Sequence, residues 1–151
     1  NHKLTGVKFE DAFDTTTIAN AEKVMQKSAE VFRQETENVF NALAIYFYSL
    51  DDKNLTPANY IKIGDMAFSI KYRGATGGYS LASDIANSMY KFCDAASNIL
   101  PAEGHKILEL HFKALGQVIE EKIAQNDAVT ARKLINGLEQ LSDKYTKKKA
   151  G

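Results

Sequence analysis

The chain has 151 residues, of which 44% are hydrophobic and 25% charged, as is typical of one globular domain and not of a disordered chain. Nineteen Lys and Arg balance nineteen Asp and Glu, so the basic excess that is common in nucleic-acid-binding and membrane-surface proteins is absent. No apolar run approaches the roughly 20 residues of a membrane-spanning helix, and no apolar signal segment follows Asn1. We therefore expect a cytoplasmic domain that binds neither nucleic acid nor membrane.

The scarcity of helix-breaking residues predicts an all-α fold. There are only nine Gly and two Pro, and no segment alternates β-branched and polar residues. Residues 1–16 carry Phe9 and Phe13 at no fixed period, so we expect an N-terminal arm lying on the domain. A single bundle is expected over residues 17–147, followed by a basic tail at 148–151.

The first helical pattern runs from about residue 18 to 50. Its apolar residues recur at steps of three, four and seven, which indicates one stripe facing a core: Phe32, Val39, Phe40, Leu43, Phe47 and Leu50. Ser28 is expected to mark a break between a short first helix and a longer second one.

The next helix begins with a clear start signal. The Thr56 hydroxyl can cap a helix, and Pro57 lacks a donor that the first turn would not use. The core stripe of this helix is expected to be Tyr60, Ile63, Ala67 and Ile70. It should end near Arg73, before the glycine-rich segment 74–78, which we interpret as a turn because it lacks the Lys-Ser/Thr of a phosphate-binding loop.

Three further helical patterns follow. Ser80 is expected to cap the first, Pro101 to open the second and Asp127 to cap the third. Their predicted inward residues are Leu81, Ile85, Met89, Phe92 and Ala96; then Leu108, His111, Leu115, Val118 and Ile119; then Ala131, Leu134, Leu138, Leu141 and Tyr145. Long helices joined by short turns predict an antiparallel four-helix bundle with an N-terminal helical extension.

Few residues suit catalysis or metal binding. One cysteine and three scattered histidines offer no tetrahedral zinc set, so we expect no metal and no cofactor. Cys93 and His111 each share a stripe with apolar residues, and we expect a core thiol and a hydrogen-bonded, semi-buried histidine. The sequence also lacks the standard nucleotide-binding and hydrolase motifs, which argues against an enzyme.

The helix that carries the core residue Ala67 also has aromatic residues on a second face. Phe68 lies about 100° around from Ala67, and Tyr72 follows one turn later, with Lys71 beside them. Exposed aromatics with a cationic rim are typical of a protein contact surface. The alternative is that Phe9 or Phe13 of the arm covers them.

The segment from Met66 to Leu81, MAFSIKYRGATGGYSL, resembles the central helix–turn–helix of histidine-containing phosphotransfer (HPt) domains. It is closest to the alphaproteobacterial stand-alone type, with the pattern Ala-His-x-Ile-Lys-Gly-x-Gly-x-x-x-Gly-Tyr-x-Leu. The similarity continues at 85–93 and 108–115 and covers roughly residues 20–147. It implies a helical bundle that passes phosphoryl groups between aspartates of response-regulator receiver domains.

Two positions depart from that pattern. The acceptor histidine falls on Phe68, and the small residue one turn later falls on Tyr72, whereas Lys71 and Gly78 are retained. A benzene ring has no lone pair to attack an aspartyl phosphate. The resemblance then implies a monomeric adaptor that docks a receiver domain or a histidine kinase without carrying phosphate. The partner-binding residues that it implies are Phe68, Lys71, Tyr72, Thr76 and Gly78.

Two alternatives stay open at this point. The chain could be an active phosphotransfer protein that uses His105 or His111 instead, although neither lies where the family presents its acceptor. It could also be an unrelated helical protein-interaction domain.

Overall fold

The computed structural model describes residues 15–50, 55–120 and 128–150, and within these ranges it contains helices and turns but no strand. The prediction of an all-α fold is therefore confirmed. The five helices are α3 (Thr15–Tyr48), α4 (Pro57–Thr76), α5 (Ser80–Ile99), α6 (Gly104–Glu120) and α7 (Ala128–Ala150).

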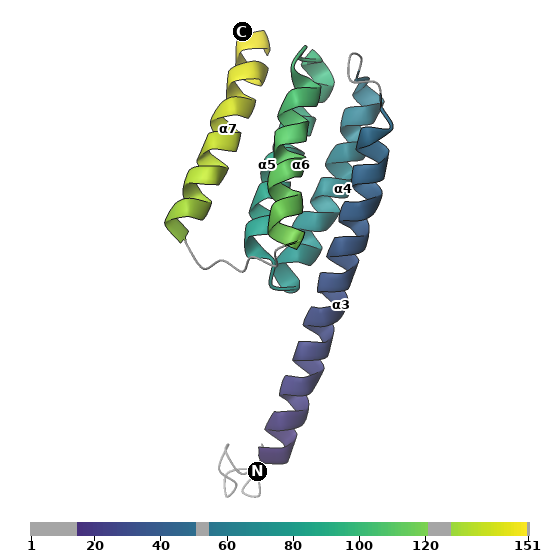
Figure 1. The fold of residues 1–151 in the computed structure, drawn as a ribbon, viewed down its shortest axis with the longest axis vertical. Helices are drawn as coiled ribbons and strands as arrows, with labels where there is room; N and C mark the ends of the chain where they lie inside the picture. Colours follow the sequence, from purple (N-terminus) through teal and green to yellow (C-terminus); the bar gives the residue numbers. More distant parts are fainter. Residues whose placement is uncertain (1–14, 51–54, 121–127, 151) are drawn as a thin grey trace, which may run out of the picture.

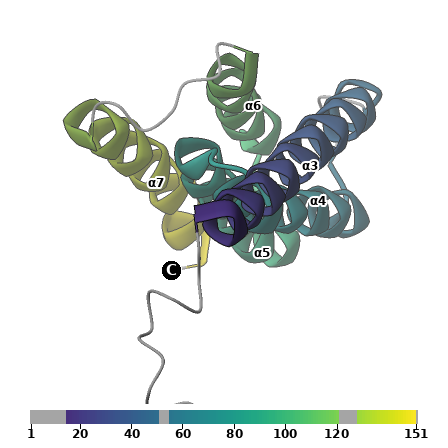
Figure 2. The ribbon, with the colours of Figure 1, turned by 90° about the horizontal axis from the view of Figure 1, so that it is seen from below.

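Helices α4 and α5 form a tightly packed hairpin at the centre of the molecule. The C-terminal half of α3 packs along α4, while α6 and α7 pack on α5 (Figure 1). In the view from below, α7 lies on the left and α6 at the top, while α3 runs obliquely from the middle towards the upper right (Figure 2). The long α3 extends well past the other helices at its N-terminal end (Figure 1).

The core contains the predicted stripes of α4, α5 and α6. Every residue expected to face inward on these three helices is buried. From α3, the core receives Leu43 and Phe47, and Phe47 stacks on Phe112 with ring centroids 4.5 Å apart. The 3.6-residue period of the apolar residues was enough to predict these buried positions, because each of the three helices presents one apolar side to its neighbours.

The start of α4 also matches its prediction. The Thr56 hydroxyl accepts a hydrogen bond from the Asn59 backbone N–H at 3.1 Å, and the Asn59 side-chain oxygen accepts one from the Thr56 N–H at 2.9 Å. This reciprocal capping box, with Pro57 as the first helical residue, satisfies donors that the helix itself cannot. The helix continues past Arg73 to Thr76.

The predicted break at Ser28 is wrong. Helix α3 runs without interruption from Thr15 to Tyr48, and this stretch contains neither Gly nor Pro. Serine costs a helix only a few tenths of a kcal/mol relative to alanine, and neighbouring Ala, Glu, Lys and Gln residues are good helix formers. Near Ser28 the helix passes from exposed residues to residues that pack on other helices, but its backbone stays continuous.

Three other expectations need correction. Ser80 does not cap α5: it is the first helical residue, and Tyr79 stands at the cap with no side-chain hydrogen bond. Pro101 lies in the preceding turn, where its carbonyl accepts from the Gly104 N–H at 3.0 Å, and α6 begins at Gly104. On α7, Leu134 is exposed, and the next residue, Ile135, packs against the core in its place.

Some boundary predictions fall at the edges of the described ranges. Residues 1–14 of the expected arm, Asp127 and Gly151 lie outside them, while Thr15 and Thr16 belong to α3. Residues 148–150 of the expected basic tail continue α7. In the described part of the chain, no helix combines the length and apolar character that a membrane crossing requires.

Candidate protein-docking face

The α4–α5 turn is built so that it can rest on α3. Gly78 has φ +88°, a left-handed conformation that favours glycine. A Cβ on Gly77 would lie 2.8 Å from the Arg33 backbone nitrogen, so a side chain there would clash with the backbone of α3. Arg33 Nε donates to the Gly77 carbonyl at 3.2 Å. The glycines therefore form a structural turn, as expected, and the turn anchors α4 to α3.

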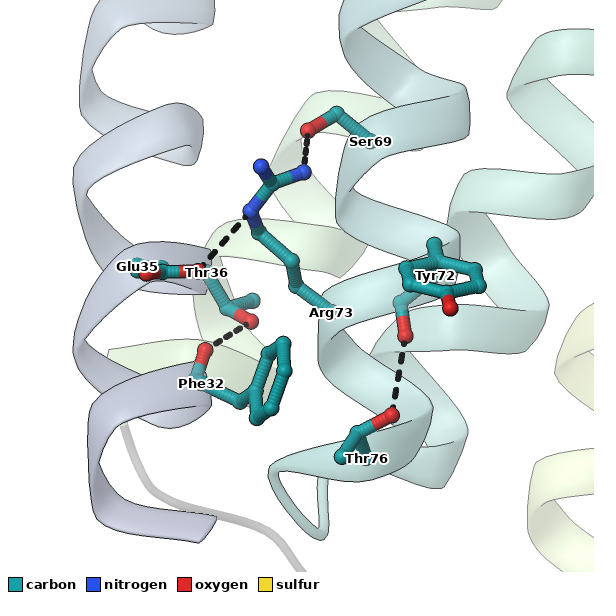
Figure 3. A network of polar contacts seen from close by, with 7 residues as sticks. All are labelled: Phe32, Glu35, Thr36, Ser69, Tyr72, Arg73 and Thr76. Carbon is teal, nitrogen blue, oxygen red and sulfur yellow. Dashed lines mark hydrogen bonds and ion pairs between the residues drawn. The ribbon is translucent and has the colours of Figure 1, made fainter. Parts of the chain in front are cut away.

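One side of α4 is held against α3 by a polar network (Figure 3). Arg73 Nε donates to Glu35 Oε2 at 3.0 Å, and Arg73 Nη1 donates to the Ser69 hydroxyl. Because both members of the ion pair are partly exposed, its contribution to stability is small, on the order of 0.5 kcal/mol. These contacts join the Arg73 side of α4 to α3, while the buried stripe of Tyr60, Ile63, Ala67 and Ile70 sets which side of α4 faces outward.

The outward side of α4 carries Phe68 and Tyr72. Phe68 is 48% exposed and Tyr72 66% exposed. The Phe68 ring packs on Tyr90 of α5 with centroids 5.4 Å apart and planes at 57°, and Lys71 Nζ lies 5.7 Å from the Phe68 centroid. We call Phe68, Lys71, Tyr72 and Tyr90 the aromatic face. Figure 3 shows Tyr72 directed away from α3, opposite to Arg73.

The residues implied by the resemblance lie along one edge of the hairpin. Phe68, Tyr72 and Thr76 occupy successive turns of α4, and the Thr76 hydroxyl donates to the Tyr72 carbonyl at 3.4 Å. Lys71 is half-buried beside them, while Gly78 forms the turn beyond. The arm residues Phe9 and Phe13, which could have covered this face, lie outside the described residues.

A small groove of about 100 Å³ continues from the aromatic face between α4 and α5. Tyr90 and Asp65 line it at the surface, and Tyr60 and Cys93 line its floor. Burial, with a smaller contribution from Cys93, raises the pKa of Tyr60 to about 12. Burial also raises the pKa of the Cys93 thiol, aided by Asp94, so the predicted core thiol is confirmed and is no nucleophile at neutral pH.

His111 lies on the inward stripe of α6, as predicted, but it is completely buried and not semi-buried. Its Nδ1 donates to the Ile107 carbonyl at 2.8 Å, which leaves Nε2 to accept from the Ser88 hydroxyl at 2.9 Å. Burial lowers the pKa of His111, and the bond to Ile107 opposes this only in part. His105 stacks on Phe47 with ring centroids 4.5 Å apart.

Two features of this region had no place in the sequence prediction. Tyr90 was missed, although its position one residue after the core residue Met89 puts it at the edge of the buried stripe of α5. The contact between Arg33 and Gly77 joins residues 44 positions apart, and no local pattern signals it.

The site thus offers an aromatic surface with one cation and a buried thiol and histidine, all on rigid helices. Among the described residues, no three His, Cys, Asp or Glu side chains gather where they could hold a metal ion. Comparisons of the chain with protein-family models, curated proteins and solved structures find no match.

Proposed function

We propose that the protein is an HPt-like signalling adaptor that docks a receiver domain or a histidine kinase without carrying phosphate. Its core would be an antiparallel four-helix bundle made by the packed half of α3 with α4, α5 and α6. The observation that carries the proposal is a half-exposed Phe68 midway along α4, at the position where the HPt pattern has its acceptor histidine.

The chemistry of Phe68 separates docking from phosphate transfer. An acceptor needs a nitrogen lone pair to attack an aspartyl phosphate, and the phenyl ring has none. The same ring can still be buried by a partner, and aromatic residues at the centre of an interface commonly contribute most of its binding energy. We therefore propose that the protein uses the surface around Phe68 for docking and does not transfer phosphate.

The neighbours of Phe68 suit such a partner. Lys71 places an ammonium group beside the ring, where it would complement the aspartates of a receiver's active site. Tyr72 replaces the small residue of the family pattern and stands 66% exposed one turn away. A receiver would therefore rest against both rings and could not close over residue 68 as over an acceptor.

The histidines give little support to an active phosphotransfer protein. An acceptor imidazole must present a free nitrogen to its donor, but His111 is fully buried and both its nitrogens are hydrogen-bonded. His105 is partly exposed, yet it belongs to the first turn of α6 and stacks on Phe47 of α3, away from the aromatic face on α4.

The test is direct binding to purified receiver domains and histidine kinases, measured by calorimetry. Phe68→Ala should weaken the complex at least tenfold, which corresponds to about 1.4 kcal/mol. Leu110→Ala is the matched control, because Leu110 is also a half-exposed apolar residue but lies on α6. Equal affinity for both variants, or no binding partner in either class, would leave the unrelated helical interaction domain as the better description.

Incubation with phosphorylated receivers tests the second half of the proposal. The protein should acquire no acid-labile phosphohistidine. A label on His105 or His111 would instead support the active phosphotransfer alternative.

A further inference from the structure

Helix α3 has two halves with different surroundings. Residues 32–48 pack on the other helices, whereas no residue in 15–31 is buried and only Ala29 is partly covered. The change occurs where the α4–α5 turn meets Phe32 and Arg33. Beyond this point about 25 Å of helix projects alone, as Figure 1 shows.

The projecting half nevertheless continues the apolar stripe of the packed half. At 100° per residue, Ile18, Ala21, Met25 and Ala29 fall within about 40° of the line through the core residue Leu43. Met25 is 64% exposed, and Val24 and Val31 widen the apolar side. The apolar side that packs on the other helices in residues 32–48 thus continues into residues 15–31, where it is uncovered.

The projecting half lacks the contacts that usually stabilise a helix. Most helical stability in proteins comes from packing an apolar face, and no residue of 15–31 is buried. Charge does not favour a membrane or a strongly charged partner, because Glu22 and Glu30 balance Lys23 and Lys27 in this segment. A neutral amphipathic helix does not repel a copy of itself.

We propose that the projecting halves of α3 from two copies of this chain pack against each other in antiparallel orientation. With a two-fold axis at residue 23, Ala21 of one copy faces Met25 of the second, and Ile18 faces Ser28. In both of these pairs a large residue meets a small one, so the apolar side of one copy is complementary to that of the second.

Residue 23 is the midpoint of residues 15–31, so an axis there pairs Thr15 of one copy with Val31 of the second. In this arrangement the dimer would cover the whole bare half of α3, up to the point where the α4–α5 turn meets Phe32 and Arg33. Fewer residues per side take part than the roughly 20–30 of a standard interface, so we expect a reversible dimer with micromolar affinity in place of the monomer favoured by the sequence.

Sedimentation of the full chain over a concentration series tests the dimer. The wild type should pass from monomer to dimer, and Met25→Glu should raise the dissociation constant at least tenfold. Ile45→Glu is the matched control: Ile45 is 75% exposed on the same helix but lies on the packed half, off the stripe. Both side chains are exposed, so neither variant should lower the thermal stability of the bundle.

Disulfide cross-linking tests the orientation. Glu22→Cys should cross-link readily, because the two copies of residue 22 would differ by about 3 Å along the axis, whereas Ile18→Cys should not, at about 15 Å. Native Cys93 is buried and gives little background. A monomer at every concentration, a dimer insensitive to Met25→Glu, or cross-linking of Ile18→Cys alone would each overturn the proposal. So would a monomer whose stripe binds a different protein.

Discussion

The two sides of α4 contrast in how their apolar residues are used. Tyr60, Ile63, Ala67 and Ile70 face inward and are almost completely buried, while Phe68 and Tyr72 stand on the outer side and are 48% and 66% exposed. Both rows belong to one helix with one backbone geometry. The inner row is therefore explained by the fold, but the outer row is not, and this difference is the reason for proposing that the outer row binds a partner.

The largest effect should come from the inner side. Ile63→Ala removes a fully buried side chain from the centre of the hairpin and leaves a cavity. Such changes typically cost about 2–5 kcal/mol of unfolding free energy. Urea denaturation followed by circular dichroism would measure the loss.

Phe68→Ala supplies the matched change on the outer side. Here the loss should stay within about 1–2 kcal/mol, because the ring is half-exposed and packs chiefly on Tyr90. If Phe68→Ala destabilised the protein as much as Ile63→Ala, the two sides of α4 would be equivalent and Phe68 would count as core.

Much of this contrast could be predicted from the sequence. The period of the apolar residues identified the inner stripes of α4, α5 and α6, and the offset of Phe68 and Tyr72 from Ala67 placed them on another side. Thr56 and Pro57 marked the start of α4, because a cap depends on residues three positions apart.

What depends on distant parts of the chain could not be predicted. Arg73 of α4 bonds to Glu35 of α3, 38 positions away, and the α4–α5 turn contacts α3 through Arg33. On α7, the stripe predicted Leu134 to be buried, but the neighbouring Ile135 packs against the core instead. Ser142 and Thr146 are buried as well, which is possible because their hydroxyls bond to carbonyls of their own helix.

Acid should lower the free energy of unfolding through the buried His111. Burial keeps the pKa of folded His111 below its ordinary value of about 6.5, so the unfolded chain binds more protons as the pH falls below that value. The contribution to stability is therefore fully present above about pH 6.5 and is lost as the pH falls towards the folded pKa. Urea midpoints between pH 7.5 and 5 would measure this, and the loss should be smaller than that from Ile63→Ala.

His111→Gln provides the control for the acid experiment. Glutamine offers a donor and an acceptor but does not titrate in this range, so the dependence of stability on pH should flatten. The same slope in His111→Gln and wild type would assign the acid sensitivity to other groups.

The smallest effect is expected at Tyr79, where the inner side of the hairpin meets α3. Its side chain is buried, and its hydroxyl finds no hydrogen-bond partner among the described residues. Burial raises the pKa of Tyr79, Glu37 adds to this and Arg33 opposes it, so the hydroxyl stays protonated and unpaired at neutral pH.

Tyr79→Phe removes this unsatisfied group and keeps the ring that lies 5.8 Å from the Arg33 guanidinium carbon. Because a buried polar group without a partner is costly, the variant should be as stable as the wild type or more stable by up to about 1 kcal/mol. A fall in thermal stability would instead show that the hydroxyl stabilises the packing of the α4–α5 hairpin on α3. Tyr79 would then count among the polar contacts between the hairpin and α3, and not only among the residues of the apolar core.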